Sequence, residues 1–85
     1  GDSMWPTLKH GDKFDALVYS GQEINIGEII VFRDPTHISR ICVKRVLHIK
    51  PNGLFVEGDN PDPTASTDSH NYGLVSFDLL IGMKR

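Results

Sequence analysis

The chain has 85 residues, a formal net charge of −2 and 39% hydrophobic residues. This length fits one small domain with a thin core, so we expect residues 1–85 to form a single domain. The charge argues against nucleic-acid binding, because no basic excess is present to neutralise phosphates. The one cysteine cannot form a disulfide within the chain.

Membrane and secretion signals are missing from the sequence as it stands. No stretch approaches the roughly 18 apolar residues that a membrane-spanning helix needs, and no signal peptide is visible. The composition is that of a soluble domain. However, the chain opens directly on Gly1-Asp2-Ser3-Met4, with no strand or helix before it. We therefore expect the natural protein to begin further upstream, and to associate with a membrane if that segment holds an anchor.

Apolar segments bounded by turn residues predict five strands, which cover residues 12–19, 28–33, 38–49, 54–56 and 79–83. Asn52-Gly53 marks a tight turn between two of them. The segment 59–71 is rich in Asp, Pro, Ser and Thr and is predicted to be a loop. Helix is limited to one turn after Ser3 and one turn capped by Ser76. These features predict a mostly β fold, a small coiled sheet or partial barrel with little helix.

Ser3 is the first candidate for chemistry. It lies between a glycine and the proline of Gly1-Asp2-Ser3-Met4-Trp5-Pro6, which is typical of a residue presented on a sharp bend. A nucleophilic hydroxyl needs such exposure to a carbonyl, with backbone N–H groups nearby for the oxyanion. The alternative is that Ser3 only caps a short turn.

Lys44 is the second candidate. Alternation along the predicted strand 38–49 places Lys44 between Cys42 and Val46 on a partly apolar face. Burial there would disfavour the ammonium form and lower the pKa, so that a neutral lysine could take the proton of a serine hydroxyl. The alternative is a lysine that protects a strand edge from aggregation.

A third polar segment covers residues 58–73. Its hydroxyl and carboxylate side chains could orient a lysine amine, although a surface loop of Asx turns fits equally well. A calcium loop does not fit, because Pro61 and Pro63 interrupt the alternation of ligands. No zinc site is expected either, since His10, His37 and His48 show no paired ligand spacing.

Taken in order, four segments resemble the type I signal peptidase family: residues 1–8, 27–33, 43–46 and 58–73. They look like its nucleophile box, the strand that follows, its general-base box and its last box. The resemblance covers nearly the whole chain. It implies the fold of the family's catalytic core and a serine endopeptidase, with no cofactor and no metal, that removes signal peptides or leader propeptides. The partner would then be a precursor protein with a cleavable N-terminal leader.

The resemblance also implies roles for particular residues. Ser3 would attack the scissile carbonyl and Lys44 would accept its proton. Ser66 would hydrogen-bond the lysine amine, and Asp68 would help build the loop beside it. Two further residues, Met4 and Trp5, are expected to border the substrate groove.

Two departures from the family pattern stand out. His70 occupies a position that is usually arginine, and a protonated histidine there could pair with Asp68. The stretch between Lys44 and Gly58 is short, which indicates a minimal core. In its small size and in the sequence of the 58–69 loop, the chain resembles the compact branch that includes the maturation proteases of nickel-type superoxide dismutase. This resemblance implies a dedicated maturation protease.

Other hypotheses remain open. A self-cleaving repressor-type protease would share the Ser-Lys pair and a similar sheet, but neither a cleavage segment nor a DNA-binding domain is present here. An inactive binding module of the same fold would have no reason to retain both Ser3 and Lys44. A triad through His70 is a further alternative. Cys42 in an apolar strand is interpreted as a small core residue.

Overall fold

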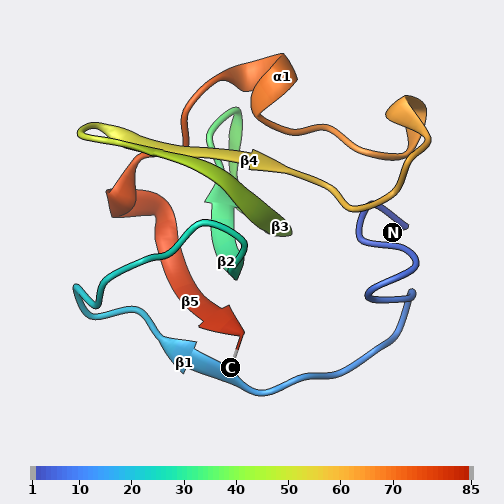
Figure 1. Cartoon of the computed structure of the whole chain (residues 1–85), viewed down its shortest axis with the longest axis horizontal. Helices are drawn as coiled ribbons and strands as arrows, with labels where there is room; N and C mark the ends of the chain where they lie inside the picture. The colour runs from blue at the N-terminus through green and yellow to red at the C-terminus, as the bar shows by residue number, and fades with distance from the viewer. Residues whose placement is uncertain (1, 85) are drawn as a thin grey trace.

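A computed structural model describes residues 2–84 of the chain (Figure 1). Its five strands form one antiparallel sheet in the spatial order β1-β5-β2-β3-β4. The strands are β1 (Ala16–Val18), β2 (Ile29–Asp34), β3 (His37–Lys50), β4 (Gly53–Glu57) and β5 (Leu80–Lys84). The prediction of a mostly β fold with little helix is confirmed. The sheet is open, with β1 and β4 at opposite edges.

Strand β2 lies at the centre of the sheet, between β5 and β3. Its apolar run predicts this position, because a strand with covered faces needs consecutive hydrophobic residues. Ile30 and Phe32 are fully buried, and Ile29 is nearly so. Ile30 and Phe32 pack with side chains from the other strands and loops to form the core: Ile24, Val46, Leu54, Val56, Val75 and Met83.

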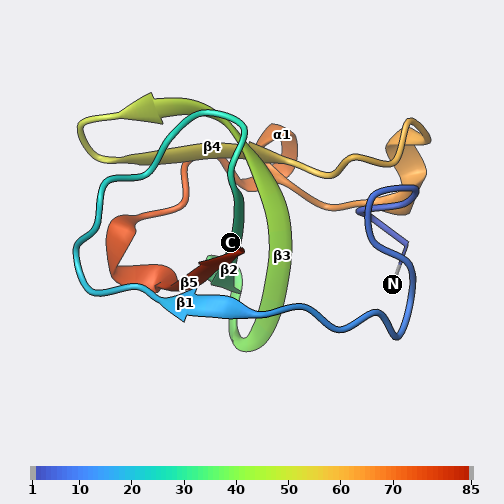
Figure 2. The same cartoon turned by 60° about the horizontal axis from the view of Figure 1, so that its bottom comes forward.

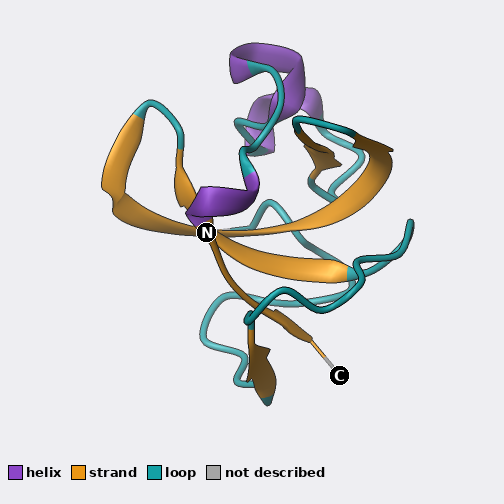
Figure 3. Ribbon diagram, turned by 90° about the vertical axis from the view of Figure 1, so that its left-hand side faces the viewer, coloured by secondary structure: helices purple, strands orange, loops and turns teal. Residues whose placement is uncertain are grey.

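Strand β3 is the longest element, and the burial of its residues varies along its length. Its first residues are exposed, whereas Lys44 and Val46 are buried. A register shift between Val46 and His48 interrupts its pairing with β4, and such bulges bend and twist a strand. Figure 2 shows β3 curving away from β2 toward the hairpin with β4, and Figure 3 shows the strongly bent strands of the sheet in orange. The predicted turn at Asn52 joins these two strands.

Three short helical segments interrupt the second half of the chain: η1 (Pro63–Ala65), α1 (Ser69–Tyr72) and η2 (Phe77–Leu79). The turn η2 begins after Ser76, as predicted. Of the other two, η1 lies within the segment 59–71 that was predicted to be a loop, and α1 begins in that segment and ends one residue beyond it. Each begins after an aspartate, Asp62 or Asp68, whose side chain accepts a backbone N–H, which is how such residues start short helices.

The N-terminal segment forms hydrogen-bonded turns where one helical turn was predicted, and one of them is closed by the i→i−4 bond of a helical turn. Trp5 N donates to Asp2 O, and Leu8 N donates to Met4 O. Figures 1 and 2 show this segment beside the loop that follows β4. Strand β1 is shorter than predicted, because only three of its residues pair with β5. No helix within residues 2–84 is long and apolar enough to cross a membrane.

Candidate active site

The fold brings Ser3 and Lys44 together, although 41 positions separate them in the sequence. Lys44 Nζ donates a hydrogen bond to Ser3 Oγ at 2.8 Å and lies 3.4 Å from Val43 O. Lys44 comes from the middle of β3, whereas Ser3 comes from the N-terminal turns. A serine hydroxyl within hydrogen-bond reach of a base is the geometry that nucleophilic catalysis requires.

The burial of Lys44 has its origin in the strand alternation. Cys42, Lys44 and Val46 share the inward face of β3, and Lys44 lies opposite the fully buried Ile30 in the β2–β3 register. Only 5% of Lys44 is exposed. Burial therefore lowers the pKa of the amine below its ordinary value, while the negative charge of Asp68 partly opposes this shift. A lowered pKa increases the fraction of neutral lysine, the form that can accept a proton.

Backbone hydrogen bonds hold Ser3 in place. Asn60 N donates to Ser3 O at 2.9 Å, and the Asn60 side-chain amide donates to Asp2 O at 2.9 Å. Asn60 thus fixes both peptide units on either side of the candidate nucleophile. The loop after β4 therefore sets where the Ser3 hydroxyl lies relative to β3.

Asp59 ties this loop to both reactive segments, which sequence reasoning missed. Its two carboxylate oxygens accept hydrogen bonds from Arg45 Nε at 2.8 Å and Arg45 Nη2 at 2.7 Å, and Thr7 Oγ1 donates to Oδ2 at 2.6 Å. The bonds from Arg45 lower the pKa of Asp59, and the same bonds raise the pKa of Arg45. Arg45 also donates to Gly27 O at 2.7 Å. The sequence offered one signal for this ion pair: Arg45 directly follows Lys44, and Asp59 directly follows Gly58.

Ser66 lies against Gly58 at the edge of the dyad. Its buried Oγ has no hydrogen-bond partner within residues 2–84, so the expected bond to the Lys44 amine is not formed in this arrangement. The amine donates instead to Ser3 and to Val43 O. A Cβ on Gly58 would lie 2.5 Å from Ser3 O and 2.7 Å from Ser66 Oγ, so only glycine lets these segments meet. The orienting role of Ser66 remains a prediction.

Asp68 shapes the loop on the far side of Ser66. It caps α1, with the backbone N–H of His70 donating to Oδ1 at 2.9 Å and that of Gly58 to Oδ2 at 3.4 Å. Asn71 completes a capping box with the Asp68 backbone. The His70 ring nitrogen Nδ1 lies 2.9 Å from Asp68 Oδ1, and its ring packs edge-on against Phe55. The hydrogen bonds of the structure therefore pair His70 with Asp68 and Ser3 with Lys44, which is the pairing of a Ser-Lys dyad and not of a triad through His70.

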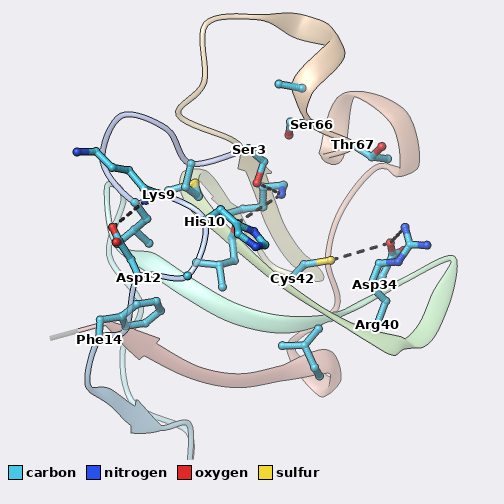
Figure 4. A pocket seen from close by; sticks show the side chains of 17 residues that line it. Ser3, Lys9, His10, Asp12, Phe14, Asp34, Arg40, Cys42, Ser66 and Thr67 are labelled. Atoms are coloured by element: carbon cyan, nitrogen blue, oxygen red, sulfur yellow. Dashed lines mark hydrogen bonds and ion pairs between the residues drawn. The ribbon is translucent and has the colours of Figure 1, made fainter. Parts of the chain in front are cut away.

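A cavity of about 380 Å³ extends along the sheet from the dyad. Ser3, Met4 and Lys44 line it, as do Ser66 and residues near the start of β3 (Figure 4). Met4 is thus placed where a groove residue was expected. Trp5 is not, since it is 47% exposed and does not line this cavity. No group of three or more metal-ligating side chains is found among residues 2–84.

Among curated proteins, the chain is similar to the "Mitochondrial ATP-independent inner membrane protease subunit 1a" of Arabidopsis thaliana. The two are 30% identical over 107 aligned positions, which cover 96% of this chain and 62% of that protein. The chain therefore spans less than two thirds of its relative's length. That relative is a protease subunit, and the similarity to it gives no support to the narrower nickel-type superoxide dismutase branch. No protein-family model matches the chain, and no solved structure matches it.

Proposed function

We propose that this chain is a serine endopeptidase that removes leader peptides from precursor proteins, with Ser3 as nucleophile and Lys44 as general base. The observation that carries the proposal is the 2.8 Å contact between Ser3 Oγ and the buried Lys44 Nζ. A surface lysine would remain charged and could not act as a base near neutral pH. Burial provides the physical reason for the amine to be neutral.

The proposed reaction begins when neutral Lys44 takes the hydroxyl proton as Ser3 Oγ attacks the scissile carbonyl. The new C–O bond gives a tetrahedral oxyanion, which the backbone N–H of Ser3 would stabilise. Lys44, now an ammonium, returns the proton to the leaving amine as the C–N bond breaks. Water then attacks the acyl-serine while Lys44 accepts its proton, and Lys44 returns that proton to Ser3 Oγ as the acyl C–O bond breaks and the carboxyl product leaves.

A protease activity is supported by the name of the similar protein, which is an inner membrane protease subunit, and leader removal is the part of the proposal that rests on the family resemblance of the sequence segments. A membrane location and a precursor protein as partner are likewise parts of the proposal. Dedicated maturation of a single precursor is a narrower form of it and would require a single natural substrate. A self-cleaving repressor-type protease remains the second candidate, because it would use the same Ser-Lys pair.

Cleavage of a precursor or leader-junction peptide by purified variants tests the proposal. Ser3→Ala and Lys44→Ala should each abolish cleavage, because the first removes the attacking oxygen and the second removes the base. Ser39→Ala and Lys50→Ala are matched controls, since both residues are exposed on β3 away from the cavity. Both controls should cleave at the wild-type rate.

Circular dichroism separates loss of chemistry from loss of fold in these variants. The Ser3→Ala and Lys44→Ala chains should keep the wild-type β spectrum. Cleavage that persists in folded Lys44→Ala would show that the proposed base is wrong. Cleavage that occurs only within a single chain, and never on an added peptide, would favour the self-cleaving candidate.

A further inference from the structure

The far end of the cavity contains an arginine that the proposed chemistry does not use. Arg40 lines this end, together with the buried Asp34 and with Cys42 (Figure 4). Arg40 lies on β3 four residues before Lys44, so alternation places both side chains on the same face of the strand. At a rise of about 3.3 Å per residue, roughly 13 Å separates the two positions.

The buried carboxylate of Asp34 forms an ion pair with this arginine. Asp34 is 2% exposed, and its Oδ1 accepts hydrogen bonds from Thr36 N at 2.8 Å and Thr36 Oγ1 at 2.7 Å. Burial alone would raise the pKa of Asp34, but the hydrogen bonds from Thr36 and the charge of Arg40 lower it overall. Asp34 therefore keeps a negative charge beneath the guanidinium.

The Arg40 guanidinium remains open to a ligand. Its Nη1 lies 3.9 Å from Asp34 Oδ2, which is longer than a hydrogen bond, and its side chain is 62% exposed. A guanidinium has five N–H donors in a planar fork that matches a carboxylate. The arginine thus lies beside a buried opposite charge, and its guanidinium stays accessible at this end of the cavity.

The other groups in the cavity favour an anionic ligand over a cationic one. Asp34 also lines the cavity, but it is only 2% exposed and its Oδ1 already accepts two hydrogen bonds from Thr36. Asp12 is exposed but accepts a hydrogen bond from Lys9 N at the opposite end. Burial raises the pKa of Cys42, so its thiol remains neutral between Arg40 and the dyad. Arg40 is therefore the accessible charge at its end of the cavity.

We propose that Arg40 selects substrates with an aspartate or glutamate a few residues from the scissile bond, and that Asp34 is the positioning residue for its guanidinium. The inference rests on the proposed function, because it assumes that a peptide occupies this cavity with its scissile bond at Ser3. An extended peptide has the same rise as β3, so a carboxylate about four residues from the cleaved bond would reach Arg40.

Peptide binding to the Ser3→Ala chain tests this subsite without requiring cleavage. The probes are alanine-rich twelve-residue peptides with glutamate at one of several successive positions, and matched peptides with glutamine or lysine there. At one or two adjacent positions, the glutamate peptide should bind about fivefold more tightly than its glutamine counterpart. The preference should shrink in 0.5 M salt, because screening weakens a partly exposed ion pair.

Variants in the same Ser3→Ala background locate the preference. Arg40→Gln should remove it, and Arg33→Gln should retain it, because Arg33 does not line the cavity. Asp34→Asn should reduce the ratio of glutamate to glutamine affinity if it positions Arg40, and a purely structural role would leave this ratio unchanged in the folded chain.

The outcomes separate this inference from the proposed function. Equal binding of glutamate and glutamine peptides at every position, or a preference that survives in Arg40→Gln, would overturn the subsite. Wild-type cleavage without a glutamate preference would leave the protease standing and reject the subsite. Binding with the preference but without wild-type cleavage would support the subsite and reject the protease. Neither binding nor cleavage would reject both.

Discussion

Replacing Asp59 with asparagine tests how the site is assembled. The Asp59 carboxylate joins Thr7, which follows the candidate nucleophile, to Arg45, which neighbours the candidate base. The substitution keeps the shape of the side chain and removes its charge. It should therefore loosen the connection between the N-terminal turns, β3 and the loop after β4.

The size of the effect follows from the contacts. Hydrogen bonds to charged groups contribute about 1.5–3 kcal/mol each, and asparagine can still offer one acceptor oxygen. Arg45 is one-third exposed and Asp59 is 15% exposed, so solvent screens part of the attraction. We expect Asp59→Asn to lower the free energy of unfolding by about 2 kcal/mol, or roughly 8–16 °C in the melting temperature of a domain this small.

Thermal unfolding followed by circular dichroism, at several pH values, measures this effect. Because Arg45 lowers the pKa of Asp59 in the folded state, the stabilisation is complete above the ordinary carboxyl pKa of about 3.9. It is lost as the pH falls through the lowered folded value. The wild-type and Asp59→Asn melting curves should therefore differ at pH 7 and converge in acid.

Asp15→Asn is the control, because Asp15 is exposed and the substitution removes the same charge at a different place in the chain. It should melt with the wild type. Equal melting temperatures for Asp59→Asn and wild type at pH 7 would refute the role of this ion pair. A difference that persisted unchanged in strong acid would refute its electrostatic origin.

Three further substitutions have defined outcomes. Gly58→Ala should sharply reduce peptide cleavage, because its Cβ would displace Ser3 O and Ser66 Oγ, and cleavage assays on the folded variant check this. Lys44→Met should abolish cleavage but raise stability at pH 7 by about 1 kcal/mol, measured by denaturant unfolding, because it replaces a buried amine, which is costly to desolvate, with an apolar side chain. Tyr72→Phe should stabilise the chain by about 1 kcal/mol in the same assay, because the Tyr72 hydroxyl is buried without a partner in residues 2–84.

Much of the sheet could be predicted because its strands carry their own signals. The apolar run of β2 indicated a central strand, and alternation in β3 indicated the buried face that includes Lys44. The helix α1 was missed because its start is a local capping box, Asp68 with Asn71, within a segment of loop-like composition. Such a pattern is visible in the sequence but is also typical of Asx turns.

The contacts that assemble the site could not be predicted from local patterns. Thr7 and Asp59 are 52 positions apart, and Arg45 and Asp59 are 14 apart. Their pairing depends on the register of β3 with β4 and on the path of the following loop. The family resemblance ordered the segments, but it assigned Ser66 a hydrogen bond to the lysine that the packing against Gly58 does not form.

The pH dependence of peptide cleavage tests most directly whether a buried lysine activates Ser3. A lysine base works only after it loses its proton, so the rate should rise as the pH passes through the pKa of Lys44. Burial lowers that pKa, and the rise should therefore be centred below the ordinary lysine value of about 10.4. A profile that is flat from mildly acidic to alkaline pH would contradict a lysine base.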